Sequence, residues 1–219
     1  MGRSYRLLLE CAKVSGGPTE LSGVALSSDP AGDRFVRIRI FDQTLGLSAA
    51  LFRLPGKKSG QSVPPDLFDD LECQLNPLRP GSSIPFVAEY QKARSYRELA
   101  RKPAHFLSAS EIARFYLNNG SHLLDPRPRL ELLRKALDSF SRSLVPKVVL
   151  LKLYFCFARD EGLPVRESWL SYLPQVLAEE TRRALSRPVS EEGLDANRIE
   201  ELVESIKLWM NAETELRVE

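Results

Sequence analysis

The chain has 219 residues, of which 43% are hydrophobic and 27% are charged, a composition typical of a folded globular protein. No stretch approaches the roughly 18 uncharged apolar residues of a membrane span, and Glu10 interrupts the first apolar run, so we expect neither a membrane protein nor a signal peptide. The three cysteines (Cys11, Cys73 and Cys156) form no CxxC pair, which excludes a disulfide scaffold or a zinc ribbon and favours the reducing cytoplasm.

The apolar pattern of residues 1–91 predicts a small β-domain. Short apolar segments alternate with runs rich in glycine, proline, serine and aspartate, as in a small barrel or sandwich. The expected strands lie at Leu7–Leu9, Val24–Leu26, Phe35–Phe41, Leu47–Leu54, Asp66–Leu75 and Pro85–Tyr90.

From about Gln91 the apolar residues recur at helical spacing, so residues 92–219 predict an all-helical domain and the chain as a whole an α+β protein. The boundary is expected between residues 91 and 105. The expected helices are one capped at Ser108 and then Leu130–Leu144, Lys147–Glu161, Ser168–Leu185 and Asn197–Glu213. The helix Lys147–Glu161 is apolar on nearly every side, which predicts that it forms the centre of a bundle.

Charge is distributed unevenly between the two halves. Residues 1–105 contain 15 Lys or Arg and 11 Asp or Glu, a charge of +4, whereas the remainder contains 16 and 18, a charge of −2. A basic first half indicates an anionic partner for that half.

The strand Phe35–Phe41 carries the clearest candidate site. Its period of two places Val36, Ile38 and Ile40 on one face, which we expect in the core. The opposite face then presents Phe35, Arg37, Arg39 and Phe41, two cations between two aromatic rings. Guanidinium groups neutralise phosphates and rings stack on unpaired bases, so this face predicts binding of single-stranded nucleic acid. The alternative is a solvated face whose aromatic rings cover a neighbouring loop.

Two further basic segments extend this prediction. Arg53, Lys57 and Lys58 lie in a glycine-containing loop after a strand and could follow a phosphate backbone, although a solvated hairpin tip explains them too. Near the expected domain boundary are Lys92, Arg94, Arg97, Arg101 and Lys102. Arg94, Arg97 and Arg101 would share one face of a helix, beside the β-domain or simply in solvent.

No catalytic or metal-binding pattern stands out. His105 and His122 are the only histidines, and neither has a metal-ligand spacing. Asp69, Asp70 and Glu72 form one acidic cluster, which a metal-dependent nuclease could use but which fits a solvated strand edge better. We therefore expect a protein that is not an enzyme and has no cofactor or bound metal.

Several of these segments resemble the RecO family of DNA repair proteins. The run Asp42-Gln43-Thr44-Leu45-Gly46-Leu47, followed by Arg53 and then Gly56-Lys57-Lys58, is similar to the strand–turn–strand signature of the OB-fold in that family. The apolar helix Val148–Gly162, with its exit through Leu163-Pro164, looks like the family's central helix. The resemblance covers roughly residues 22–170.

The resemblance implies an OB-fold-like barrel and a recombination mediator. Such a protein binds single- and double-stranded DNA, anneals complementary strands, and works with RecR and single-strand-binding protein to load RecA in the cytoplasm, at the nucleoid. The implied DNA-binding residues are Arg37, Arg39, Arg53, Lys57 and Lys58. The helical domain would bind the acidic tail of single-strand-binding protein, with the candidate cations Arg129, Arg134, Lys147 and Lys152.

The chain departs from the family in two places. Many members carry a four-cysteine zinc site after the central helix, but residues 165–173 contain no cysteine, so zinc is not carried over. The first 21 residues precede the usual first barrel strand as an addition. Outside the family, the main alternative is a helical protein-interaction adaptor whose barrel serves only as a scaffold.

Overall fold

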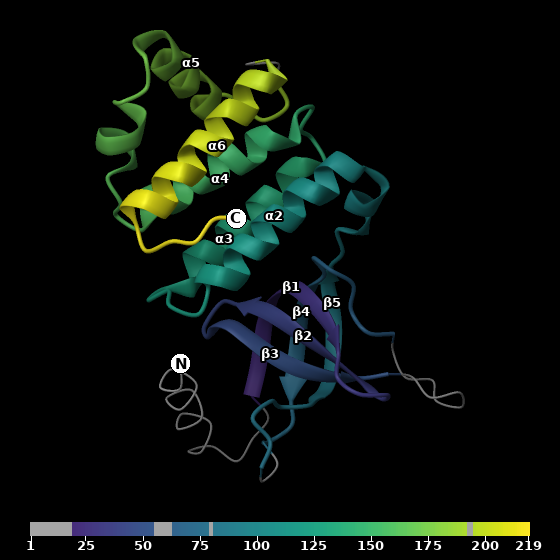
Figure 1. Cartoon of the computed structure of the whole chain (residues 1–219). Helices are drawn as coiled ribbons and strands as arrows, with labels where there is room; N and C mark the ends of the chain where they lie inside the picture. Colours follow the sequence, from purple (N-terminus) through teal and green to yellow (C-terminus); the bar gives the residue numbers. More distant parts are fainter. Residues whose placement is uncertain (1–18, 55–62, 79–80, 192–194) are drawn as a thin grey trace. The chain divides into compact units, whose positions relative to one another are not determined.

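The computed structural model describes residues 19–54, 63–78, 81–191 and 195–219, which form two compact units. The first unit (the sheet unit) contains the described residues up to Arg97 together with residues 120–130. The second (the helical unit) contains residues 98–119 and the described residues from 131 onward. Strands come first along the chain and helices follow (Figure 1), which confirms the expected α+β class. The expected segment Leu7–Leu9 lies outside the described residues.

A five-stranded antiparallel sheet forms the sheet unit. Its strands follow one another along the chain as β1 (Thr19–Pro30), β2 (Phe35–Asp42), β3 (Gly46–Arg53), β4 (Asp70–Leu75) and β5 (Val87–Arg94). The spatial order is β3-β2-β1-β4-β5, so the long strand β1 is central and pairs with both β2 and β4. A five-stranded, partly open barrel of this kind is typical of an OB-fold.

The sheet curls so that its two edge strands approach each other, but the barrel is not closed. A single parallel bridge joins Leu51 of β3 to Phe86, the residue before β5, and the Leu51 N–H donates to the Pro85 carbonyl at 2.9 Å. Among the described residues, no further strand pairing joins β3 and β5. We call this line of contact the β3–β5 seam.

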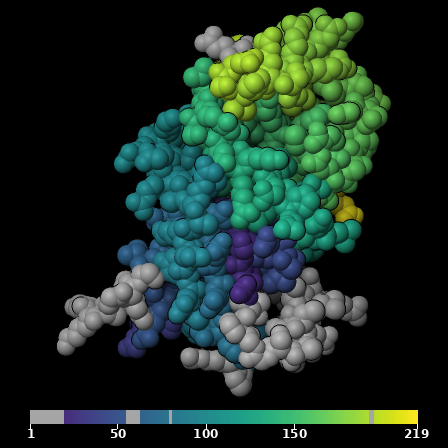
Figure 2. All heavy atoms as spheres, turned by 180° about the vertical axis from the view of Figure 1, so that it is seen from behind, coloured from purple at the N-terminus to yellow at the C-terminus, as the bar shows by residue number. Residues whose placement is uncertain are grey.

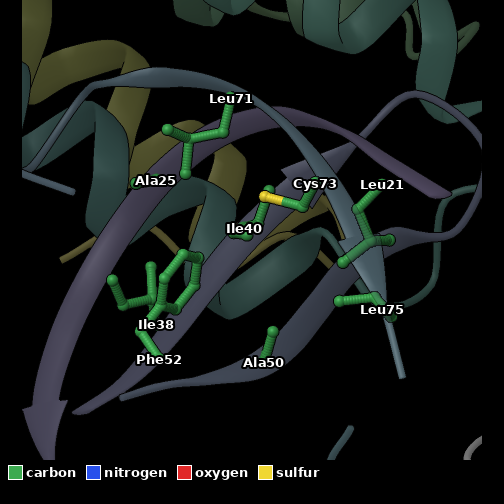
Figure 3. Close-up of a cluster of buried hydrophobic side chains, with 9 residues drawn as sticks. All are labelled: Leu21, Ala25, Ile38, Ile40, Ala50, Phe52, Leu71, Cys73 and Leu75. Atoms are coloured by element: carbon green, nitrogen blue, oxygen red, sulfur yellow. The ribbon is translucent and has the colours of Figure 1, made fainter. Parts of the chain in front are cut away.

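Hydrophobic side chains from four strands fill the inside of the curled sheet (Figure 3). The strand β2 contributes Ile38 and Ile40, both fully buried, and Val36 packs against the same cluster, as the alternation of β2 predicts. The remaining members are Leu21, Ala25, Ala50, Phe52, Leu71, Cys73 and Leu75. The inward face of β2 is therefore confirmed.

The β2–β3 turn is organised by Asp42. Its buried carboxylate accepts hydrogen bonds from the backbone N–H groups of Ser22, Thr44 and Leu45, each at 2.7 Å. Gly46 closes the turn at a φ of 68°, where a Cβ would lie 2.6 Å from the carbonyl oxygen of Gly120. The Asp-x-x-x-Gly spacing thus supports both a tight turn and the approach of residues 120–130 within the sheet unit.

The boundary falls within the expected region of residues 91–105, but beyond the domain end predicted at residue 91. The strand β5 continues to Arg94, and the sheet unit extends to Arg97 and takes in residues 120–130. The reason is physical: residues 88–94 of β5 are mostly exposed, so they lack the apolar alternation that marks a strand in sequence.

The helical unit is built around one apolar helix. The elements after the sheet are the 3₁₀ turn η1 (Arg97–Arg101), α2 (Pro103–Asn119), α3 (Pro126–Phe140), α4 (Pro146–Asp160), the π turn η2 (Val165–Leu170), α5 (Gln175–Ser186) and α6 (Ala196–Glu213). The helix α4 contacts α2, α5 and α6 and buries most of its side chains, which confirms it as the centre of the bundle. In the space-filling view the chain from α5 to α6, light green to yellow-green, lies on the surface of this unit (Figure 2).

Aromatic rings cross-link the helical core. Phe115 of α2 makes edge-to-face contacts with Tyr154 and Phe157 of α4, at centroid distances of 5.3 and 4.7 Å. Two reciprocal bonds fasten α6: the Trp169 indole N–H donates to Ser205 Oγ, and that of Trp209 to Ser168 Oγ, both at 3.0 Å.

The expected continuous helix Ser168–Leu185 is wrong. The chain instead makes the turn η2 and, after a break, begins α5 at Gln175. Pro174 stands at the break with an extended ψ of 141°; proline lacks an N–H and disfavours helical backbone in the residue before it. In the described part of the chain, no helix is both long and apolar enough to cross a membrane.

Candidate nucleic-acid interface

One face of the β2–β3 strand pair gathers the predicted cations. Arg37 and Arg39 project outward, with 46% and 40% of their side chains exposed. Their register partners on β3 are Leu51 and Ala49, and Phe35 is paired in the same way with Arg53. We call the residues Phe35, Arg37, Arg39, Leu51 and Arg53 the β2–β3 outer face. The sequence therefore placed Phe35 and the three arginines correctly on one surface.

Phe41 does not belong to this surface, which corrects the prediction. In the alternation of β2, Phe41 falls on the same face as Arg37 and Arg39, but its side chain is fully buried. At that end of the strand pair, Leu47, the register partner of Phe41, donates a backbone hydrogen bond to Gly120 at 3.2 Å. Residues 120–130 thus lie against this end of the sheet, and Phe41 is unable to stack on a base.

The opposite end of the β2–β3 outer face runs into a groove at the β3–β5 seam. The groove has a volume of about 890 Å³, and both residues of the Leu51–Phe86 bridge line it. It is lined by Phe35, Leu51, Phe52, Arg53, Pro64, Asn76, Phe86, Val87, Ala88, Glu89 and Tyr90. Phe35, Leu51 and Arg53 belong to both features, so the face and the groove form one continuous surface.

Three partly exposed aromatic residues, Phe35, Phe86 and Tyr90, line this groove, and the ring of Tyr90 packs edge-to-face on the buried ring of Phe52. The rings of Phe35 and Phe86 lie 5.1 Å apart between centroids, and those of Phe52 and Tyr90 lie 5.3 Å apart. The Tyr90 hydroxyl donates to the Val63 carbonyl, which fixes its ring. Aromatic rings beside exposed guanidinium groups are the two components of a single-strand binding surface.

Sequence reasoning missed Phe86 and Tyr90. Their segment was recognised as a strand, but nothing in its local pattern shows that it lies beside β3. The available signal was the run Pro85-Phe86-Val87, which leads into the last strand of the sheet. Because the sheet must curl to bury its apolar face, this last strand comes to lie near the opposite edge strand, β3.

The arginines of the outer face already have acidic and polar neighbours on β1. Asp29 Oδ2 lies 3.6 Å from Arg37 and 3.8 Å from Arg39, and Arg39 Nε donates to Ser27 Oγ at 2.9 Å. Lys57 and Lys58, the other cations expected near Arg53, lie outside the described residues.

Arg94, Arg97 and Arg101, expected on one helical face at the domain boundary, do not form such a face. Arg94 ends the strand β5, and Arg97 begins the turn η1, so the expected helical spacing is wrong. The Arg94 guanidinium lies over the Tyr96 ring at 4.9 Å, and Arg97 pairs with Asp66 at 3.7 Å. Lys92 Nζ contacts Asp69 at 2.6 Å. These side chains serve local contacts within the sheet unit.

The acidic cluster is not the solvated edge that the sequence suggested. The strand β4 lies between β1 and β5, and Asp69 and Asp70 are buried, whereas Glu72 is exposed. Asp69 accepts from the Asp66 N–H at 2.8 Å as well as from Lys92. Among the residues that the structure describes, no group of three or more His, Cys, Asp or Glu side chains is placed to hold a metal ion.

The four cations expected to bind an acidic tail are dispersed and engaged. Arg129 is buried, Arg134 pairs with Glu131 at 2.7 Å, and Lys147 pairs with Glu111 at 2.8 Å. Lys152 Nζ donates to the carbonyls of Leu185 and Arg187, and burial lowers its pKa. An acidic peptide would have to displace these contacts.

An apolar hollow of about 280 Å³ lies elsewhere in the helical unit. The apolar residues that line it are Leu144, Val145, Val148, Ala184, Pro188, Val189 and Ile199. Arg187 supplies a cation at its rim, and Glu191 and Asp195 supply carboxylates.

Comparison with known proteins gives no relative: no protein-family model matches this chain, and no curated protein is significantly similar to it.

Proposed function

We propose that this chain binds single-stranded DNA on the β2–β3 outer face and in the adjoining groove, and acts as a recombination mediator of the RecO type. The observation that carries the proposal is the continuity of two exposed arginines with a groove lined by three partly exposed aromatic residues, Phe35, Phe86 and Tyr90. Successive outward residues of a strand are about 6.5–7 Å apart, a spacing close to the phosphate repeat of an extended single strand. Arg37 and Arg39 would contact neighbouring phosphates while unpaired bases enter the groove.

The resemblance to the RecO family supplies the biological setting of the proposal. In that setting the protein binds duplex DNA as well, anneals complementary strands, and acts with RecR and single-strand-binding protein to load RecA. The tail of single-strand-binding protein is not assigned to the apolar hollow of the helical unit, because Glu191 and Asp195 line it beside Arg187 and would repel an acidic peptide.

Binding of a fluorescent oligonucleotide across a salt series tests the DNA-binding part. We expect affinity for single-stranded DNA to fall steeply with salt, and Arg37→Ala with Arg39→Ala to lower the slope by about 1.4, at 0.7 per phosphate contact. Arg182→Ala with Arg183→Ala removes the same charge from exposed positions on α5 that have no proposed DNA contact and is the control. An unchanged slope in the folded double arginine variant would place the DNA site elsewhere.

Annealing and RecA-loading assays test the mediator part. We expect the protein to accelerate annealing of complementary oligonucleotides coated with single-strand-binding protein, and the double arginine variant to lose that acceleration. A chain that binds no DNA but binds a protein partner through the helical unit would instead be an interaction adaptor.

A further inference from the structure

Asp29 occupies the place between the two arginines where a phosphate would lie. It is on β1, opposite Arg37 in the strand register, and Ser27 is opposite Arg39. A single oxygen, Oδ2, faces both guanidinium groups, at 3.6 and 3.8 Å, and also accepts a weak hydrogen bond from Ser27 Oγ at 3.4 Å. The carboxylate therefore offsets one of the two positive charges that Arg37 and Arg39 bring to the site.

These contacts are longer than charge-assisted hydrogen bonds, which are about 2.7–2.9 Å. Each arginine offers five N–H donors, and of these the described contacts engage Arg39 Nε, which donates to Ser27. Asp29 thus attracts the two guanidinium groups electrostatically without accepting hydrogen bonds from their N–H groups. A DNA phosphate has several oxygens and is not attached to the protein backbone. It is therefore able to approach the guanidinium groups to full hydrogen-bonding distance.

We infer that Asp29 is an internal competitor for the DNA phosphate, which sets how tightly the β2–β3 outer face holds a single strand. The inference rests on the proposed DNA binding and adds its regulation. A single phosphate or a small anion gains little by replacing a carboxylate that is already in place. A polyanion gains because its neighbouring phosphates and stacked bases are bound at the same time, so Asp29 selects for extended strands.

The exposure of the three side chains fits an exchangeable contact. Asp29 has 38% of its side chain exposed, similar to the two arginines. Exposed ion pairs of this kind contribute little to folding, so removing the carboxylate leaves the sheet folded.

The test measures binding of an oligothymidine by fluorescence anisotropy for wild type, Asp29→Asn and Asp33→Asn. A phosphate about 5 Å from the removed carboxylate is released from repulsion, which we expect to tighten binding by Asp29→Asn about fourfold at low salt. Asp33→Asn makes the same change of charge at an exposed position in the β1–β2 turn and should change affinity less than about twofold. Asp29→Glu keeps the competitor and should stay close to wild type.

The arginine variants decide whether Asp29 acts through the proposed site. With Arg37→Ala and Arg39→Ala present, adding Asp29→Asn should no longer tighten binding. A gain that persists without the arginines, or an equal gain from Asp33→Asn, overturns the inference. If wild type binds and Asp29→Asn is unchanged, the inference alone fails; if neither protein binds, the proposed DNA binding fails with it. Thermal denaturation of each variant confirms that it is folded.

Discussion

The fully buried carboxylate of Asp69 meets the Lys92 ammonium at 2.6 Å, which joins the residue before β4 to the strand β5. Lys92 also lies 3.9 Å from Asp66, whose N–H donates to Asp69. This pair makes Lys92 part of the fold of the sheet unit.

Lys92→Met should therefore destabilise the protein without a specific effect on DNA. It leaves a buried carboxylate without its cation, for which losses of about 3–5 kcal/mol are usual. Because 31% of the Lys92 side chain is exposed and water reaches it, we expect about 2–3 kcal/mol by urea denaturation. Lys102→Met, at an exposed position, is the control and should cost less than about 0.5 kcal/mol. Equal stability of the two variants would contradict this role.

The two phenylalanines of β2 should behave in opposite ways. Phe41→Ala empties a fully buried site and should cost about 3–5 kcal/mol of stability. Phe35→Ala removes a half-buried ring at the groove and its contact with Phe86, and should cost about 1 kcal/mol. Its main effect should be on single-stranded DNA, with a loss of about 1–3 kcal/mol of binding free energy and a smaller loss for duplex. Denaturation and anisotropy on the same samples separate these effects.

Gly46→Ala should be more damaging than Gly32→Ala, although both glycines have positive φ, 68° and 80°. A side chain in that backbone region costs about 1–2 kcal/mol by itself. At Gly46 the new Cβ would also lie 2.6 Å from the Gly120 carbonyl oxygen, whereas nothing lies within 4 Å at Gly32. We expect about 1 kcal/mol for Gly32→Ala and about 3 kcal/mol for Gly46→Ala by thermal or urea unfolding. Similar losses would mean that residues 120–130 move aside freely.

Cys73 should resist alkylation until the core of the sheet unit unfolds. Burial, aided by the Asp42 carboxylate, raises the pKa of its thiol from 9.0 to about 12. At pH 8 this lowers the thiolate fraction about 1000-fold, so iodoacetamide should label Cys156, which is only partly buried, well before Cys73. Mass spectrometry in a Cys11→Ala background measures both rates. Fast labelling of Cys73 in the folded protein would show that the core is open to solvent.

The same shift has a consequence for stability at high pH. The folded thiol has a higher pKa than the unfolded one, so its contribution is complete below pH 9.0 and is lost as pH rises from 9.0 to about 12. Cys73→Ala should remove that part of the alkaline loss, which denaturation curves at pH 8 and pH 10 compare directly.

Local patterns are enough to predict the strands β2 and β3, the inward face of β2 and the apolar α4, because each depends on the periodicity of its own residues. Alternation also assigns Phe41 to the outward face, but it carries no information about what covers that face. The groove is missed because it depends on β3 meeting the segment at Phe86, a contact between residues far apart in the chain. The break at Pro174 is visible in the sequence, but the helical spacing of the apolar residues on either side of it conceals the break.

The assignment of residues 120–130 to the sheet unit changes how the chain connects its two parts. The backbone passes between them after Arg97, after Asn119 and again after Leu130, so three covalent links join them where two successive domains would have one. No single cut releases a complete sheet unit, and a fragment ending at residue 91 lacks both the end of β5 and residues 120–130. The two units are therefore expected to be gained or lost together in evolution and to unfold in one transition. Producing the sheet unit alone requires joining Arg97 to Gly120, and producing the helical unit alone requires joining Asn119 to Glu131.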